Sequence, residues 1–235
     1  MPVIESMVNW IFRPQCAACG QPAVTLCAAC RASLVELGPA CARCAEPTNP
    51  EDPQGAARCW RCALWPLPID RVVAPWRFGG QLASAIRRLK FANRAHIARD
   101  LAPLWAPVLA AAVAEHDAIV VAVPLHWRRR CRRGYDHAWL LAHHAATLAS
   151  LAPPVTALRR IRHVAAQSTL PAAERAANIR GAFAATCALA GRAVVLVDDV
   201  MTTGATLGAA ATALRDAGAG QITGLVLARA TSARE

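Results

Sequence analysis

The chain has 235 residues, 55% of them hydrophobic, and it carries a formal net charge of +11. This length leaves room for one enzyme-sized core beside a small module, and the positive charge favours polyanionic partners. No apolar run reaches the length of a membrane span, so we expect a protein that inserts into no membrane and lies in the cytoplasm.

Cysteines dominate the N-terminal part of the chain. Eight of the ten fall in four Cys-x-x-Cys pairs: Cys16/Cys19, Cys27/Cys30, Cys41/Cys44 and Cys59/Cys62. Four thiolates around one Zn²⁺ make a closed tetrahedral site, so the four pairs are enough for two structural zinc ions. The simplest arrangement joins neighbouring pairs along the chain, and an interleaved pairing fits the same spacing.

Disulfides, a redox-active pair and an iron–sulfur cluster are the alternatives to zinc. Disulfides are typical of secreted proteins, but residues 1–13 contain Glu5 and lack the basic start of a signal peptide. A redox motif normally occurs once, on a strand–helix unit, whereas four pairs in a short stretch are typical of structural metal sites. Cys131 and Cys187 stand apart, and we expect them to be small buried or partly buried residues.

We expect a domain boundary near residue 65. Residues 1–65 form a module too small to fold by hydrophobic burial alone, so metal binding would supply the missing stability. Residues 66–235 form the second domain, and three prolines between residues 66 and 75 mark the crossover. Strand-like and helix-like stretches alternate there, which predicts an α/β fold with a parallel sheet covered by helices. The stretches are residues 71–78, 81–91, 97–115, 119–125, 135–151, 194–200, 205–217 and 222–228.

A cluster of arginines follows the strand expected at residues 118–125. The strand closes on Pro124, Leu125 and His126, and the arginines are Arg128, Arg129, Arg130, Arg132 and Arg133. Guanidinium groups suit phosphate because they are forked, permanently charged donors. A solvated basic loop has the same composition. The chain has twenty-five arginines and one lysine, Lys90, a bias that reflects genome composition as well as function.

The most informative segment is AVVLVDDVMTTGATL at residues 193–207. Its aliphatic run is typical of a strand buried on both faces of a parallel sheet. Asp198 and Asp199 are expected where the strand ends, at the sheet edge where α/β proteins bind ligands, and ribose hydroxyls and Mg²⁺ would compensate their charges. The next residues are Thr202, Thr203, Gly204, Ala205 and Thr206. Their hydroxyls, with the N–H groups at a helix start, would hold a phosphate, although threonine caps alone are the structural alternative.

This segment resembles the phosphoribosyl diphosphate (PRPP) motif of type I phosphoribosyltransferases. With further strings it makes the chain similar to the competence protein F (ComF) family, whose members join a cysteine-rich zinc ribbon to a phosphoribosyltransferase domain. The strings are the paired Cys-x-x-Cys motifs, LKF at 89–91, VPLH at 123–126, RGY at 133–135, QSTLPAAERAANIRGAF at 167–183 and VDDVMTTGAT at 197–206. One departure is GYDH at 134–137, where the family usually has Gly-Phe-Asn-Gln.

The resemblance implies a PRPP site with Mg²⁺, in a type I phosphoribosyltransferase fold preceded by a double zinc ribbon. Asp198 and Asp199 would be catalytic and hold the ribose, and residues 202–206 would hold the 5-phosphate. The pyrophosphate would be bound after the first core strand, by a loop that contains Pro124, Leu125, His126, Arg128, Arg132 and Arg133. Because little chain follows the last expected strand, we expect any acceptor pocket to come from residues before Ala118.

Three functions are compatible with this resemblance. The first is a transferase that displaces pyrophosphate from PRPP with an unidentified nucleophile. The second is a DNA-uptake factor that contacts incoming single-stranded DNA and the DNA-uptake machinery. The third is a PRPP-sensing regulator without catalysis. Trp60, Trp65, Trp76 and Trp127 lie near arginines and are able to stack bases, although such residues more often pack in cores or between domains.

Overall fold

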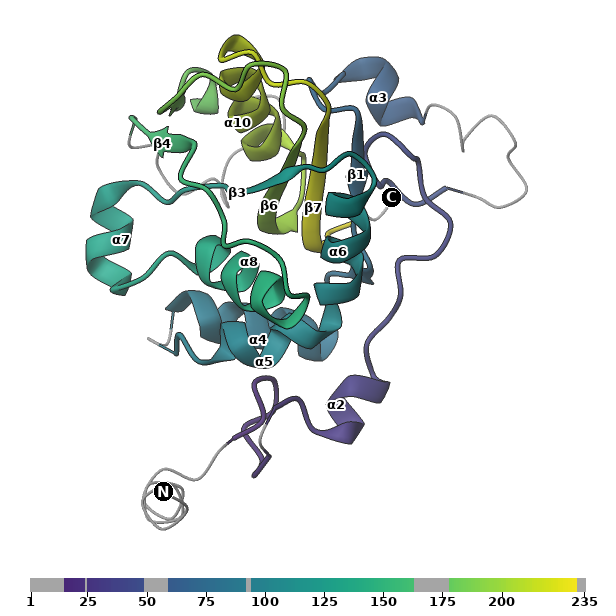
Figure 1. The fold of residues 1–235 in the computed structure, drawn as a ribbon. Coiled ribbons are helices and arrows are strands. Elements are labelled where there is room, and N and C mark those ends of the chain that lie inside the picture. Colours follow the sequence, from purple (N-terminus) through teal and green to yellow (C-terminus); the bar gives the residue numbers. More distant parts are fainter. Residues whose placement is uncertain (1–14, 24, 49–58, 92–93, 163–177, 232–235) are drawn as a thin grey trace.

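A computed structural model describes residues 15–23, 25–48, 59–91, 94–162 and 178–231. Its central feature is a sheet in the order β1–β7–β6–β3, with β2 also paired to β7 (Figure 1). Every pairing in this sheet is parallel. The strands are β1 (Arg71–Val73), β2 (Trp76–Arg77), β3 (Ile119–Ala122), β6 (Val194–Met201) and β7 (Ile222–Arg229). The expected α/β fold with a parallel sheet is confirmed.

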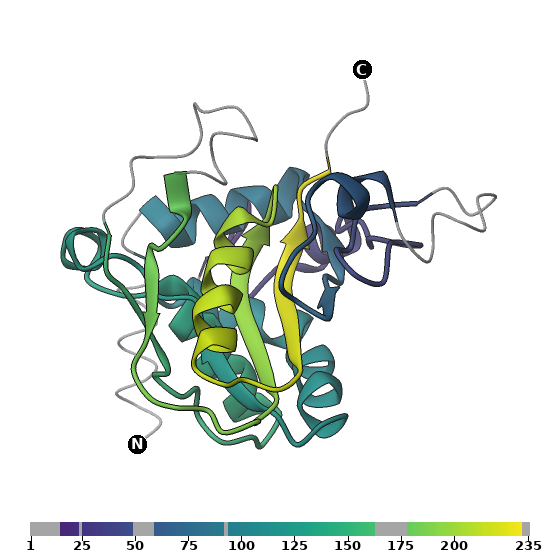
Figure 2. The same cartoon turned by 90° about the horizontal axis from the view of Figure 1, so that it is seen from above.

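Helices lie on both sides of this sheet (Figures 1 and 2). One side carries α4 (Gly80–Phe91), α5 (Ile97–Leu101), η1 (Ala102–Leu104), α6 (Ala106–Ala114) and α8 (His137–Leu148). The other side carries α10 (Ala205–Asp216) and a separate antiparallel pair, β4 (Leu158–Arg160) and β5 (Phe183–Ala185). The short helices α2 (Ala28–Ala32), α3 (Trp60–Leu64) and α7 (Trp127–Arg133) lie outside these layers.

Strand β6 separates two hydrophobic cores. Val195 and Val197 face the core shared with α4, α5 and α8, whereas Val194 and Leu196 face the core shared with α10. This alternation follows from strand geometry, in which successive side chains point to opposite faces. All four side chains are buried, which confirms the prediction of a strand covered on both faces.

Prolines divide the stretch expected at residues 97–115. It folds as α5, η1 and α6, with Pro103 in η1 and Pro107 in the first turn of α6. Proline lacks an N–H to donate and is tolerated in the first turn of a helix, so each proline begins a new segment. Among the described residues no single helix is long and apolar enough to cross a membrane; only the bent pair Ile97–Leu104 and Ala106–Ala114, taken together, has that length and composition.

The two halves of the cysteine-rich segment pack against different cores. Cys16 and Cys30 join the core on the α4 side, whereas Cys41 and Cys44 join the core on the α10 side. On the first side, Arg88 of α4 donates a hydrogen bond to the carbonyl of Cys16 at 2.9 Å. Such contacts join the segment to both faces of the sheet. The domain boundary near residue 65 stays a prediction.

Candidate active site and metal centres

Asp198 and Asp199 lie inside β6, not after its end. The strand continues because Val200 and Met201 pair in register with the last two residues of β7. The prediction that β6 ends at the aspartates is therefore wrong. Successive strand residues alternate between the faces of a sheet, yet both aspartates line one cavity. Asp199 is buried, with 3% of its surface exposed, and Asp198 is partly buried.

The Asp199 carboxylate is held by side chains from two helices. Its Oδ2 lies 2.6 Å from Nζ of Lys90 on α4 and 3.0 Å from Nε2 of His137 on α8. The other ring nitrogen of His137 lies 3.2 Å from Nη1 of Arg133. Burial alone would raise the pKa of Asp199, but the charge of Lys90 and the adjacent His137 hold that pKa well below its usual value. Asp199 is an ionised carboxylate in a fixed position.

The pKa of Asp198 is shifted in the opposite direction. Withdrawal from water, followed by the adjacent charge of Asp199, raises the pKa of Asp198 to about 7. Ligand atoms of His137, Asp198 and Asp199 all lie within 4.8 Å of one another. A cation bound there would relieve the repulsion between the carboxylates. Carboxylate oxygens are the ligands that Mg²⁺ takes in proteins, so the two aspartates fit this ion.

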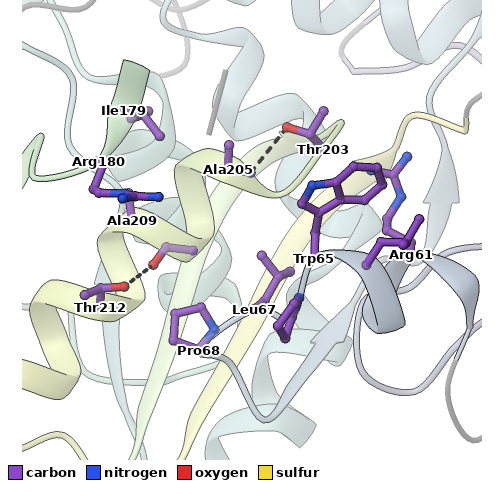
Figure 3. A pocket seen from close by; sticks show the side chains of 13 residues that line it. Arg61, Trp65, Leu67, Pro68, Ile179, Arg180, Thr203, Ala205, Ala209 and Thr212 are labelled. Carbon is purple, nitrogen blue, oxygen red and sulfur yellow. Dashed lines mark hydrogen bonds between the residues drawn. The ribbon is translucent and has the colours of Figure 1, made fainter. Parts of the chain in front are cut away.

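The β6–α10 turn, residues 202–206, forms a small cradle beside the aspartates. Its cavity of about 20 Å³ is lined by Asp198 and residues 200–207. Gly204 has φ = +82°, and a Cβ there would lie 2.6 Å from Cε of Met201. The Thr203 hydroxyl accepts a hydrogen bond from the Ala205 N–H at 3.3 Å (Figure 3). Backbone N–H groups at the start of a helix, with hydroxyls beside them, suit a phosphate group.

A cavity of about 310 Å³ brings most of the predicted residues together. Those that line it are Pro124, Leu125, Arg133, Asp198, Asp199, Thr202 and Thr206. Thr203, Gly204 and Ala205 line the smaller cradle of the β6–α10 turn. The two cavities therefore bring together the carboxylate pair, the hydroxyl-rich turn and part of the arginine cluster. The assignment of these residues to a PRPP site stays a prediction.

Three predicted residues line neither this cavity nor the cradle of the β6–α10 turn. His126 is buried and caps α7, because its Nδ1 accepts a hydrogen bond from the Arg128 N–H at 3.3 Å. Arg128 and Arg132 are exposed residues of α7. The expected arginine loop is instead the helix α7, which ends at Gly134 in the left-handed conformation. Residues four apart lie on one face of a helix, so Arg129 and Arg133 reach the cavity together.

The lining also includes side chains outside the predicted site residues, namely Lys90, Phe91, Val123, Arg129, His137, Arg160 and Val200. Lys90 had a signal in the sequence, because it is the single lysine of a chain with twenty-five arginines. Arg160 had none, since β4 was not expected; its guanidinium lies 5.3 Å from the centre of the Phe183 ring. The first part of the QSTLPAAERAANIRGAF string, residues 167–177, lies outside the described residues.

The GYDH string fixes α7 and α8 around the cavity. The Tyr135 hydroxyl donates to the carbonyl of Leu89. The Asp136 carboxylate accepts hydrogen bonds from the Leu125 N–H at 2.7 Å and from the Trp139 N–H at 3.3 Å, the second of which caps α8. The polar groups that depart from the usual family string therefore act inside the site, Asp136 as a helix cap and His137 as a partner of Asp199.

A second cavity, of about 300 Å³, lies against α10 (Figure 3). It is lined by α10 and by the chain that leaves the cysteine-rich segment, including Trp65, Leu67 and Pro68. A Cβ at Gly204 would lie 3.0 Å from Cδ1 of Leu67, and one at Gly208 would lie 3.1 Å from its Cδ2. The exit of the cysteine-rich segment is thus packed directly against the β6–α10 turn.

The cysteines form two clusters of neighbouring pairs. One consists of Cys16, Cys19, Cys27 and Cys30, and the other of Cys41, Cys44, Cys59 and Cys62; within each, the Sγ atoms lie within 4.8 Å of one another. The pairing of neighbours is confirmed. All ten cysteines are free in the structure. Cys131 and Cys187 are exposed, so the expectation of burial is wrong; Cys131 lies on α7, which buries no residue.

The ionisation of these thiols fits a cation at each cluster. Burial opposes ionisation, but hydrogen bonds from backbone N–H groups lower the pKa of Cys16 to about 6 and that of Cys41 to about 7. Burial raises the pKa of Cys30 to about 12 and that of Cys62 to about 11. A bound Zn²⁺ would ionise the remaining thiols, and two Cys₄ clusters of this kind fit two structural zinc ions.

Comparisons with known proteins agree with both parts of the site. Residues 7–63 match the double zinc ribbon domain, and residues 145–235 match the phosphoribosyl transferase domain. Competence protein F of Haemophilus influenzae is 31% identical over 212 residues, which are 87% of this chain and 90% of that protein. DNA utilization protein YhgH of Salmonella typhi is 32% identical over 187 residues, 77% and 80% of the two chains. YhgH of Escherichia coli K12 is 35% identical over 153 residues, 63% and 67% of the two chains.

Proposed function

The chain belongs to the competence protein F family, and from this premise we propose that it binds PRPP with Mg²⁺ around Asp198 and Asp199 and handles incoming single-stranded DNA in the cytoplasm. One observation carries the PRPP part. The carboxylate pair, the β6–α10 turn and the guanidinium groups of Arg129 and Arg133 border one cavity of about 310 Å³. Carboxylates for ribose hydroxyls, a helix start for a phosphate and arginines for a diphosphate match the three parts of PRPP.

Each group has a distinct task in this proposal. Asp198 and Asp199 accept hydrogen bonds from the ribose hydroxyls, and the β6–α10 turn holds the 5-phosphate. Arg129 and Arg133 line the same cavity, where they hold the diphosphate. Mg²⁺ would neutralise charge on the diphosphate when bound. Lys90 and His137 keep Asp199 ionised and fixed, so the carboxylate is ready before the ligand arrives.

The DNA part of the proposal comes from the relatives, whose names refer to competence and to the use of DNA. The net charge of +11 supports it, because a basic surface attracts a polyanion. In this role the zinc ribbons or the basic surface would also contact the DNA-uptake machinery.

Transfer of the phosphoribosyl group to an acceptor is a second candidate. A groove of about 640 Å³ borders the proposed PRPP site and shares Pro124, Leu125 and Arg160 with it, which leaves room for an acceptor. This groove draws on residues after Ala118, whereas the sequence suggested residues before it. Release of pyrophosphate from PRPP in the presence of nucleosides or oligonucleotides would distinguish a transferase from a protein that only senses PRPP.

Calorimetric titration of PRPP with Mg²⁺ into the zinc-loaded protein tests the proposal. We expect saturable binding that is lost in Asp198→Asn/Asp199→Asn, because the amides keep the shape of the side chains and remove their charge. Asp216→Asn is the matched control, since Asp216 is exposed at the far end of α10. Binding that survives in the double variant, or an absence of binding in the wild type, would overturn the PRPP site.

A further inference from the structure

The groove beside the proposed PRPP site has a lining unlike that of the other cavities. It has a volume of about 640 Å³ and lies between α7, the start of α8 and β4. Its lining includes two tryptophans and three arginines: Trp127, Arg130, Trp139, Arg159 and Arg160. We call it the tryptophan groove.

Both tryptophans present indole surface to solvent. Trp127 is 61% exposed and Trp139 is 36% exposed, which is unusual for the side chain with the largest apolar surface. The Trp139 ring stacks on the imidazole of His143, with centroids 4.8 Å apart and an angle of 9° between the planes. The Arg128 guanidinium lies 5.3 Å from the centre of the Trp127 ring. These contacts hold the rings in place, which lowers the entropy cost of stacking a ligand on them.

The charge of the groove is positive. Arg130 and Arg159 are exposed. Asp136 also lines the groove, but its carboxylate already accepts the hydrogen bonds from the Leu125 and Trp139 N–H groups. Exposed guanidinium groups beside exposed aromatic rings are what phosphates and unpaired bases require together.

Arg160 links the groove to the site of the aspartates, because it lines both cavities. Its side chain is partly buried, and within the described part of the chain its Nε has no hydrogen-bond partner. Such a donor is costly to leave unpaired, and an anion at the junction would satisfy it. A ligand in the groove and a ligand at the aspartates would therefore meet at one guanidinium group.

We propose that the tryptophan groove binds single-stranded nucleic acid, with bases stacked on Trp127 and Trp139 and phosphates on Arg130, Arg159 and Arg160. This inference deepens the proposed function. It rests on that function only in identifying the strand bound in the cell as DNA. A duplex does not fit this arrangement, because stacking on the indoles needs unpaired bases. Since the strand and PRPP share Arg160, each lowers the affinity for the other by the same factor.

Fluorescence anisotropy with labelled oligothymidylate tests the groove. Base stacking on aromatic side chains is strong, so Trp127→Ala/Trp139→Ala should weaken binding at least about tenfold. Trp60→Ala/Trp65→Ala is the matched control, because these tryptophans are 40% and 44% exposed and lie outside the groove. It should bind the strand like the wild type. Trp76 is unsuitable as a control because it packs against the core on the α4 side.

The salt dependence gives a second readout that does not depend on the tryptophans. For single strands the logarithm of the binding constant falls with the logarithm of the salt concentration by ~0.7 for each neutralised phosphate. Arg130→Ala/Arg159→Ala should therefore lower the slope by roughly 1.4. Both changes are on exposed side chains, so the variants should keep the fold, and circular dichroism checks this.

The outcomes separate this inference from the PRPP proposal. If oligothymidylate binding falls only in Trp60→Ala/Trp65→Ala, the strand binds at the cysteine-rich segment. That result would overturn the proposal that it binds in the tryptophan groove. Equal binding of a duplex of the same length, or an unchanged salt slope, would overturn it as well. If the strand binds through the groove and calorimetry detects no PRPP in any variant, the groove stands and the PRPP site fails. Trp127→Ala/Trp139→Ala should keep the wild-type affinity for PRPP.

Discussion

The carboxylate of Glu46, two residues after the cluster residue Cys44, forms an ion pair with the guanidinium of Arg229 at the end of β7. Arg229 is fully buried, and its Nη1 also donates to the carbonyls of Met201, at 2.9 Å, and Thr202. Glu46 lies 3.0 Å from Nε of Arg61 on α3 as well. Buried polar contacts therefore run from the second cysteine cluster to the first residue of the β6–α10 turn.

Removal of the Glu46 carboxylate should damage both stability and PRPP binding. Glu46→Ala leaves Arg229 buried without its counter-ion, a change that typically costs about 3–5 kcal/mol. Affinity for PRPP should fall with it, because Arg229 positions the Thr202 carbonyl. Urea unfolding and calorimetry measure the two effects. The control is Glu115→Ala, which breaks the more exposed pair with Arg71 and should cost less than about 1 kcal/mol. Similar losses in the two variants would contradict this role for Glu46.

The two cysteine clusters should differ in their effect on PRPP. Cys41→Ser/Cys44→Ser removes the second zinc site, next to Glu46, and should weaken PRPP binding strongly. Cys16→Ser/Cys19→Ser removes the first, which packs on the α4 side, and should lose one zinc ion while PRPP binding stays near the wild-type value. Metal analysis and calorimetry on both variants check this. Equal loss of PRPP binding would mean that zinc acts only on overall folding.

The sequence predicted those parts of the molecule that depend on local pattern. The buried run of β6, the neighbouring cysteine pairs and the carboxylates beside the β6–α10 turn are all read from residues close together in the chain. Lys90, Arg160 and Glu46 act through partners more than twenty residues away, so no local pattern places them. The sequence located the arginine cluster but placed it in a loop, whereas it forms the helix α7. Composition alone does not determine that a segment is helical, nor which face of the helix turns to the cavity.

Stability and PRPP binding should depend on pH through Asp198, whose pKa is raised to about 7 in the folded chain. A carboxyl group with a raised pKa stabilises the fold at low pH, and this contribution is lost as the pH rises from ~4, the unfolded value, to about 7. Asp198→Asn does not titrate, so without ligand its melting temperature should fall less between pH 5 and 7. Mg²⁺ requires the ionised form, so wild-type affinity for PRPP with Mg²⁺ should rise between pH 6 and 8. If the affinity of Asp198→Asn rises by the same amount, the rise comes from the titration of PRPP itself and not from Asp198.

Gly204 should be required for the phosphate and not only for the turn. In Gly204→Ala the left-handed conformation costs about 1–2 kcal/mol, and the new Cβ would displace the Met201 and Leu67 side chains. Gly38→Ala is the matched control, because Gly38 has φ = +71° and a Cβ there would have nothing within 4 Å. Both variants should lose stability, measured by urea unfolding, but only Gly204→Ala should lose PRPP affinity. If Gly204→Ala is destabilised and still binds PRPP like the wild type, the 5-phosphate does not lie against this turn, and the assignment of residues 202–206 to it is wrong.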